Sequence, residues 1–179
     1  METIAVYWES IVRTYGFNLL EGLTLCQIHR PLNAAGQWGG LLQLPEGQDA
    51  LFRLVWSQFD PTGHIKFILL CDDTQWSNVQ PFLRRDQRLD DAGQALVHMP
   101  VDAIYFQGPH FGDRYGIMDY TFKALARAQA PLLAVVCSVA TIYLVFPAGW
   151  GAKAKQLLTE SFEIPKEKRE IAGHHGAHR

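Results

Sequence analysis

Short apolar or alternating stretches recur along the chain, and segments whose apolar residues follow a helical spacing lie between them. The short stretches predict strands at residues 3–8, 22–29, 51–59, 64–71, 95–99, 101–106, 132–137 and 140–146. The helical spacing predicts helices after Pro31, after an Asp-Asp-Thr cap at 72–74, over 117–128 and over 151–162. Asp60-Pro61-Thr62-Gly63 predicts a turn, because proline fixes φ and glycine permits a positive φ.

These predicted elements repeat in the same order. Strand, helix, strand, strand and helix follow one another over 22–86, and the same series returns over 101–162. Each series predicts an antiparallel sheet with helices on one face, which is the ferredoxin-like arrangement. The predicted fold class is therefore α+β, built from two ferredoxin-like βαββαβ units.

A polar and charged stretch at 84–94 separates the two series and is the best internal boundary. We interpret it as a solvated helix end and loop rather than a charged binding site. The predicted domains are then 1–94, with an N-terminal strand and the first unit, and 95–165, with the second unit. A charged and then His-rich tail at 166–179 follows them.

Composition narrows the possible classes of protein. The 179 residues are 48% hydrophobic and 19% charged, which is enough apolar material for a packed core. The net charge of −2 argues against nucleic acid as a partner. Three cysteines, Cys26, Cys71 and Cys137, lie far apart in apolar runs, and we expect them to be core residues in a reducing compartment. No signal peptide is visible, so a cytoplasmic location is expected.

One uncharged stretch, at 128–152, is long enough to span a bilayer. Pro131 opens the apolar run and Pro147 closes it, and the run is rich in valine and isoleucine, which favour strands. We therefore predict two buried strands joined by a tight turn, with a membrane helix as the alternative and no membrane among the expected partners.

The second series carries a family resemblance. Gly116-Ile117 stands at the start of a helix that continues through Phe122 and the Ala-Leu-Ala at 124–126, and Cys137-Ser138 follows the next strand. In these features the stretch from Asp102 onward resembles an ACT domain, specifically the second ACT domain of aspartokinases. That family has Pro-Gly-Val or Pro-Gly-Ile at the helix start and Thr-Ser near the strand turn.

The first series resembles the same family more weakly. Arg30-Pro31, with Ala34, Ala35 and Trp38 after it, is similar to the family's Arg-Pro-Gly loop and following helix. The resemblance covers 22–162 and implies tandem ACT units. It also implies that a strand preceding the first unit, for which 3–15 is the candidate, joins the sheet of the second.

The resemblance also implies a function. The kinase domain of aspartokinases is absent, and the sequence has neither a Walker motif nor a Gly-x-Gly-x-x-Gly run, so no enzyme activity, catalytic residue or cofactor is expected. It implies a free-standing regulatory protein that binds a small molecule, an amino acid, and forms a homodimer. The alternative is a ligand-free interaction module that docks on a separate biosynthetic enzyme.

The sharpest candidate site is the loop at 112–116 and the start of the helix after it. Gly116 lets a ligand approach the backbone closely, and helix N-terminal amides favour a carboxylate. Asp113 is placed to accept from an α-ammonium group, and Arg114 and Ile117 flank the glycine. The alternative is that Asp113 only caps the helix and Gly116 only makes the turn.

The equivalent first loop departs from the family pattern, because His29 replaces the usual acid and Leu32 replaces the glycine. Asn33 and Ala34 are its candidate ligand contacts, and Gln58 is a further candidate near the family's Gln-Asn strand pair. Pro131 stands where aspartokinases usually have an effector-binding asparagine, and proline has no amide hydrogen. These departures put the family's lysine or threonine ligand in question.

No metal site or nucleophile constellation is predicted. The tail histidines, His174, His175 and His178, lack a cysteine or carboxylate shell, so we expect no metal function from them. Ser57, Ser138 and the cysteines have no sequence neighbour that would activate them.

Overall fold

The computed structural model describes residues 11–31, 52–85, 95–112 and 114–164. These residues form an α+β structure with one antiparallel sheet, which confirms the predicted class. The strands are β1 (Gly16–Pro31), β2 (Phe52–Phe59), β3 (His64–Asp72), β4 (Ala95–Gln107), β5 (Ala134–Cys137) and β6 (Thr141–Pro147). Within this part of the chain the helices are α1 (Asp73–Arg85), α3 (Ile117–Ala126) and α4 (Gly151–Ser161).

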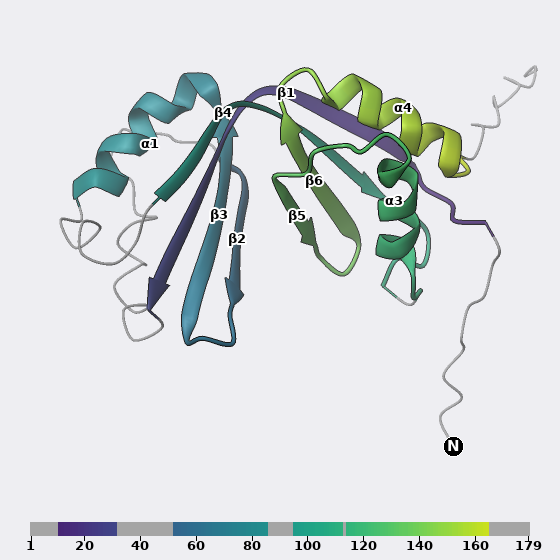
Figure 1. Cartoon of the computed structure of the whole chain (residues 1–179), viewed down its shortest axis with the longest axis horizontal. Coiled ribbons are helices and arrows are strands. Elements are labelled where there is room, and N and C mark those ends of the chain that lie inside the picture. Colours follow the sequence, from purple (N-terminus) through teal and green to yellow (C-terminus); the bar gives the residue numbers. More distant parts are fainter. Residues whose placement is uncertain (1–10, 32–51, 86–94, 113, 165–179) are drawn as a thin grey trace, which may run out of the picture.

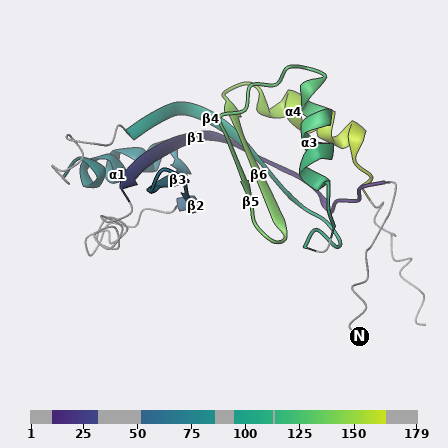
Figure 2. The ribbon, with the colours of Figure 1, turned by 60° about the horizontal axis from the view of Figure 1, so that its bottom comes forward.

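Two long strands, β1 and β4, run side by side through the whole sheet, whose order is β2-β3-β1-β4-β6-β5 (Figures 1 and 2). Only Leu23–Pro31 of β1 pairs with β3, and only Val101–Gln107 of β4 pairs with β6. The sheet therefore has a first half, ordered β2-β3-β1-β4, and a second half, ordered β1-β4-β6-β5. In contrast to the expectation of separate sheets, the two halves share both long strands.

The two long strands stay paired through two compensating bulges. Between Leu20 and Leu23, β1 has one residue more than β4, and between Leu23 and Leu25 the extra residue is in β4. Gly22 lies in the first bulge with φ of 66°, in the left-handed region that favours glycine. The predicted strand at 22–29 thus begins earlier, at Gly16. The two short strands predicted at 95–99 and 101–106 are one continuous strand.

The sheet buries apolar residues on both faces. On one face, Phe17, Ile104 and Phe106 pack with residues of α3 and α4, and Cys26 and Ile28 pack with Val79 of α1. Figure 1 shows these helices on the outer side of the bent sheet. The other face carries a separate cluster whose buried members are Leu23, Leu25, Ile68, Leu70, Val101, Ala103, Ala134, Val136 and Val145.

The inner faces of the two halves are connected directly. The side-chain amide of Gln27, on β1 in the first half, donates to the carbonyl of Leu133, just before β5 in the second, at 3.2 Å. Gln27 is buried, so this hydrogen bond satisfies a polar group that would otherwise be costly inside the inner cluster. The halves therefore pack on one another and are not joined only by the long strands.

The uncharged run at 128–152 forms β5, β6 and the start of α4, which confirms the prediction of two strands and a turn. No helix in the described part of the chain combines the length and apolar character needed to cross a bilayer. Cys26 and Cys71 are buried as predicted, but Cys137 is exposed, because it ends the edge strand β5.

Residues 11–15, directly before β1, lie in the second half. The amide of Thr14 donates to the carbonyl of Glu163, after α4, and the amide of Glu163 donates to the carbonyl of Val12. The strand before the first series that joins the second half is Gly16–Leu20, which pairs with β4. It is therefore the start of β1, whereas the candidate was 3–15, of which 3–10 lies outside the described residues.

Candidate ligand pocket at the start of helix α3

The loop from β4 to α3 lies against the turn between β5 and β6. Gly112 lies close to this turn, since a Cβ placed on it would be 3.0 Å from Cγ1 of Val139. Gly116, the N-cap of α3, has φ of 86° and so takes a conformation that L side chains rarely adopt. The two glycines thus set the path by which the loop enters α3 beside the turn.

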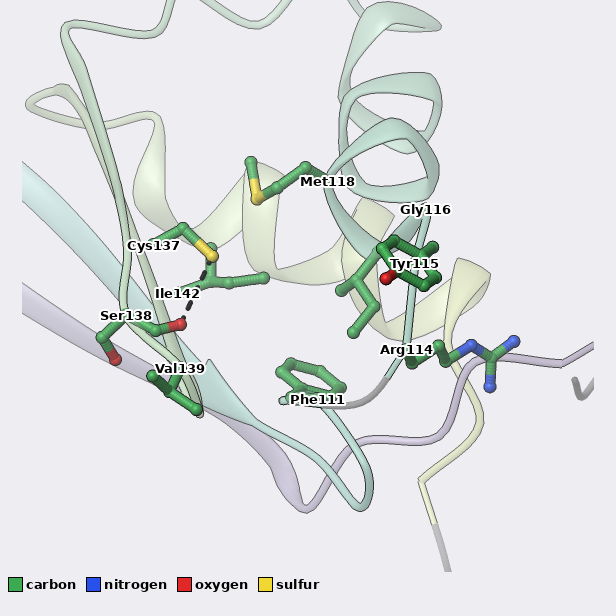
Figure 3. A pocket seen from close by; sticks show the side chains of 10 residues that line it. Phe111, Arg114, Tyr115, Gly116, Met118, Cys137, Ser138, Val139 and Ile142 are labelled. Carbon is green, nitrogen blue, oxygen red and sulfur yellow. Dashed lines mark hydrogen bonds between the residues drawn. The ribbon is translucent and has the colours of Figure 1, made fainter. Parts of the chain in front are cut away.

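A pocket of about 210 Å³ lies between this loop and this turn (Figure 3). Phe111, Arg114, Tyr115 and Gly116 line it from the loop, and Ile117 and Met118 line it from the first turn of α3. The opposite wall is formed by the end of β5, the turn and the start of β6, through Cys137, Ser138, Val139 and Ile142. The pocket is therefore shared by two segments that the hairpin pairing of β5 and β6 brings opposite α3.

Three predicted ligand residues, Arg114, Gly116 and Ile117, line this one pocket. Asp113, Asn33 and Ala34 lie outside the described residues. Gln58 is exposed on β2, in the first half, and is not part of the lining. The structure thus brings together the residues predicted from the second loop and leaves Gln58 apart from them.

Tyr115, from the predicted loop, also lines the pocket, whereas sequence reasoning did not assign Phe111, Met118, Val139 or Ile142 to the site. Cys137-Ser138 had been singled out only as part of the family resemblance. The order of the elements did contain a signal for the opposite wall. The loop between β4 and α3 and the turn between β5 and β6 lie at the same end of the sheet, so residues of the two segments can line one pocket. Which apolar side chains face the pocket depends on packing.

The described lining is mostly apolar, and Arg114, the one charged residue within it, extends its side chain out of the pocket. Nη1 of Arg114 donates to the backbone carbonyl of Ile11 at 3.0 Å. Figure 3 shows the guanidinium directed away from Met118 and Cys137. Arg114 therefore connects the loop to the segment before β1 and does not place its charge among the apolar residues.

The far wall is held by its own hydrogen bonds. The amide of Ser138 donates to the carbonyl of Thr141 at 2.8 Å, and the Ser138 hydroxyl donates to the same carbonyl at 3.2 Å. That hydroxyl also accepts from the amide of Thr141 at 3.1 Å. Partial burial raises the pKa of the Cys137 thiol, so near neutral pH the side chain is a neutral SH group.

The start of α4, in the same half, is built differently. The carboxylate of Asp102, on β4, accepts from the amides of Gly149 and Gly151 at 2.8 and 2.9 Å. Asp102 is only 2% exposed, and a Cβ on Gly151 would be 2.9 Å from its Cβ. There is no room for a ligand here, so Asp102 has a structural role.

Neither the metal-ligating side chains nor the buried thiols of the described residues form a second site. Within the described ranges, no three His, Cys, Asp or Glu side chains are grouped so that they could hold a metal ion. The tail histidines lie outside those ranges. Burial, with a smaller effect of Cys71, raises the pKa of Cys26 to about 12, so this thiol is a packing group rather than a nucleophile.

Comparison with known proteins shows the fold. No family model matches the sequence, and no curated protein matches it. Among solved structures, the regulatory subunit of aspartate kinase from Thermus flavus matches 84% of this chain and 99% of its own, with a TM-score of 0.71 and 13% identity. The likeness to the regulatory part of aspartokinases, expected from the ACT-like features, is thus confirmed for the fold.

Two aspartate kinases match over about a third of their own chains. Aspartate kinase from Clostridium acetobutylicum matches 87% of this chain and 36% of its own, with a TM-score of 0.68 and 15% identity. Escherichia coli aspartokinase III in complex with lysine and aspartate matches 88% of this chain and 35% of its own, with a TM-score of 0.58 and 15% identity.

Proposed function

We propose that this chain is a non-catalytic regulatory module that binds an amino acid in the pocket at the start of α3. In this proposal the two halves are two ACT-like units of βαββαβ design, each completed by a long strand from the other. The proposal rests on one observation, namely that three residues predicted from the second loop line a single pocket in a fold shared with aspartokinase regulatory subunits.

The strand order supports the two-unit proposal. The first half, β2-β3-β1-β4, and the second half, β5-β6-β4-β1, have the same arrangement when each is listed from its outer edge. The outer hairpin is β2-β3 in one and β5-β6 in the other, and a helix follows each hairpin. The helix predicted between β1 and β2 belongs to 32–51, outside the described residues.

The pocket offers a way to hold both ends of an amino acid. Gly116 has no side chain to cap α3, so the amides of its first turn, beginning at Ile117, are free of a side-chain cap and favour a carboxylate. Asp113, next to the lining residue Arg114, is the proposed acceptor for the α-ammonium group. The side chain of the ligand then lies among the apolar residues of the pocket.

Regulation requires that the ligand bind two arrangements of the protein with different affinities. The pocket wall consists of two segments, the β4–α3 loop and the β5–β6 turn, so a ligand between them favours the arrangement in which they are close. We propose that a homodimer or a separate biosynthetic enzyme responds to that change.

A second candidate, a ligand-free interaction module, has its own supporting observation. Tyr115 and Val139, on either side of the pocket, are 92% and 81% exposed. Large exposed apolar side chains that rim a pocket are typical of protein contact sites as well as ligand sites. In this alternative the pocket receives a side chain of a partner protein.

Calorimetric titration of the full chain with each of the twenty amino acids tests the main proposal. We expect at least one of them to bind and to raise the melting temperature. Gly116→Val should weaken that binding at least about tenfold, because the substitution distorts the loop and places a side chain at the ligand's backbone.

Gly149→Val is the matched control, since Gly149 has nearly the same φ, 84°, and likewise has open space around its Cβ position. Both variants should lose similar stability, but only Gly116→Val should lose affinity. If no amino acid binds, the regulatory proposal is wrong and the interaction module is favoured. Equal affinity losses in the two variants would show that the pocket is not the site.

A further inference from the structure

The chemistry of the pocket narrows the ligand beyond an amino acid. We infer that the ligand has an uncharged, apolar side chain of roughly leucine to phenylalanine size. This inference rests on the proposed function and concerns the same pocket. Its basis is the set of apolar side chains that line the pocket, namely Phe111, Ile117, Met118 and Ile142, with the exposed Val139 at the rim.

The size of the pocket agrees with this class of ligand. An apolar cavity of about 150 Å³ is large enough to hold a benzene ring. The pocket measures about 210 Å³, which leaves space for a branched aliphatic or aromatic side chain. Contact with Phe111, Ile117, Met118 and Ile142 would remove much of that side chain from water, which favours binding.

A cationic side chain has no partner among the described lining residues. Arg114 is their one charged group, and it has the same sign as a lysine side chain. The Cys137 thiol has its pKa raised by burial and so carries no negative charge near neutral pH. In the proposed function Asp113 is occupied by the ligand's α-ammonium group, so a lysine side-chain ammonium would lose water without gaining an ion pair from the described lining, which is costly.

A hydroxyl-bearing side chain is disfavoured for a related reason. The one serine of the lining, Ser138, already donates to Thr141 and accepts from it through its hydroxyl. Tyr115 is 92% exposed, so its hydroxyl lies in water at the rim. A threonine hydroxyl inside the pocket would therefore leave its hydrogen bonds to water unreplaced, and we expect threonine to bind more weakly than valine or leucine.

Competitive titration with leucine, isoleucine, methionine and phenylalanine against lysine, threonine and aspartate tests this class. We expect the tightest apolar amino acid to bind at least about tenfold more strongly than lysine or threonine. Lysine or threonine binding more strongly would overturn the inference while leaving the regulatory proposal intact. Failure of all twenty amino acids to bind would overturn both.

Cys137 reports whether the ligand occupies this pocket. It is the exposed cysteine of the three, so alkylation by iodoacetamide, followed by intact mass, should modify it alone in the folded chain. The apolar ligand should slow that alkylation at least about fivefold at saturation, because it covers the thiol. An unchanged rate in the presence of a bound apolar amino acid would overturn the placement.

A charge at the rim gives an independent test of the pocket. Val139→Asp places a carboxylate beside the apolar lining without disturbing the core, since Val139 is 81% exposed. This substitution should lower the affinity for apolar amino acids about tenfold and reduce the ratio of that affinity to the affinity for lysine. Val55→Asp, the same substitution at a partly exposed valine on β2 outside the pocket, should leave affinity unchanged. Equal effects of the two variants would overturn the inference.

The same alkylation assay distinguishes a protein occupant. If a second copy of the chain fills the pocket, protection of Cys137 should rise with protein concentration in the absence of any amino acid. That result would overturn the small-molecule inference. A rate independent of protein concentration, together with ligand protection, supports it.

Discussion

The two helix starts in the second half of the molecule are made in opposite ways. At α4, a buried carboxylate from β4, that of Asp102, accepts from the amides of Gly149 and Gly151. At α3, the N-cap is Gly116, which has no side chain to accept from the first turn, and the helix start lines a pocket. One start is closed by the chain itself, and the other is left accessible.

This difference separates a structural role from a binding role. The α4 start has no space beside it, because a Cβ on Gly151 would meet Asp102 and Leu19. The α3 start has space, apolar neighbours and, among the described residues, no side-chain cap, which are the properties that a ligand site requires. The comparison can be tested by changing each start and measuring stability and binding separately.

The largest effect is expected from Asp102→Ala. Removal of the carboxylate takes the acceptor from the buried amide of Gly151 and from the amide of Gly149, whose hydrogen bond is partly buried, and this should lower the free energy of unfolding by about 3 kcal/mol. Urea denaturation followed by circular dichroism measures this loss. Asp119→Ala is the control, because Asp119 is an exposed carboxylate on α3 that pairs with Lys123, and its loss should be at most about 0.5 kcal/mol.

Asp102→Asn sharpens the same test. Its side-chain oxygen keeps the shape and can accept from the two amides, but it lacks the negative charge, so we expect about half of the loss to be restored. A stability loss below about 1 kcal/mol in Asp102→Ala would contradict the structural role that we give to this residue.

A smaller effect is expected from Tyr120→Phe, which alters how α3 is attached. The Tyr120 hydroxyl donates to the carbonyl of Ser161, at the end of α4, at 2.6 Å, and its ring packs edge-on against Phe162. Phenylalanine keeps the ring contact and removes only the hydrogen bond, so the free energy of unfolding should fall by about 1 kcal/mol. Chemical denaturation measures this change.

The same variant also has a binding outcome. Tyr120 is not part of the pocket lining, so Tyr120→Phe should change amino-acid affinity less than twofold, by about 0.4 kcal/mol at most. A large loss of affinity would mean that the contact between α3 and α4 controls ligand binding in the pocket. Stability and binding could then not be assigned separately to the two helix starts.

The sequence predicts an element well where a single local pattern, such as a turn motif or a helical spacing, specifies it. The Asp-Pro-Thr-Gly turn gives the β2–β3 hairpin, and helical spacing from Ile117 and from Gly151 gives α3 and α4 at their starts. The start of β1 was predicted too late, because the bulge at Gly22 changes which residues face each side. Leu20 and Leu23 are three apart and still belong to one cluster.

Proline explains the other error in the fold. Pro100 lies between the two strands predicted at 95–99 and 101–106, and proline cannot donate to a sheet ladder. In the structure, Pro100 lies in the register shift between His98 and Val101, where β4 has a residue more than β1. A bulge accommodates the missing donor, so the strand continues. Such compensation between two strands is not visible in either one alone.

The candidate site was predictable only in part. Glycine at the start of a helix pointed to Gly116, Arg114 and Ile117, and these residues line the pocket. The opposite wall depends on the pairing of β5 with β6, which decides that Val139 faces solvent and Ile142 faces inward. Apolar sequence around Cys137 likewise predicted burial, whereas the end of an edge strand is open to water.

The smallest effect is expected in the reactivity of Cys137. It tests whether burial or the positive end of helix α3 has the larger influence on the pKa of this thiol. Partial burial raises the pKa of this thiol, so at pH 7 its thiolate fraction should lie below that of a free cysteine. Its alkylation by iodoacetamide should accordingly be slower than that of free cysteine at pH 7 and should keep rising above pH 8.5. Cys137→Ser should abolish modification of the folded chain, because burial raises the pKa of Cys26 to about 12 and of Cys71 to about 11.

The opposite result would also be informative. The positive end of a helix lowers the pKa of a nearby thiol and makes it more reactive than free cysteine. Because Cys137 and the first turn of α3 line the same pocket, a rate at pH 7 above that of free cysteine would mean that the field of α3 outweighs burial there. The pocket would then favour an anionic ligand group at Cys137, and the apolar side chain inferred for the ligand would have to lie elsewhere. A slow rate that rises with pH supports the contrast between the two helix starts, in which α3 contributes space and apolar contact and α4 contributes a closed, charged cap.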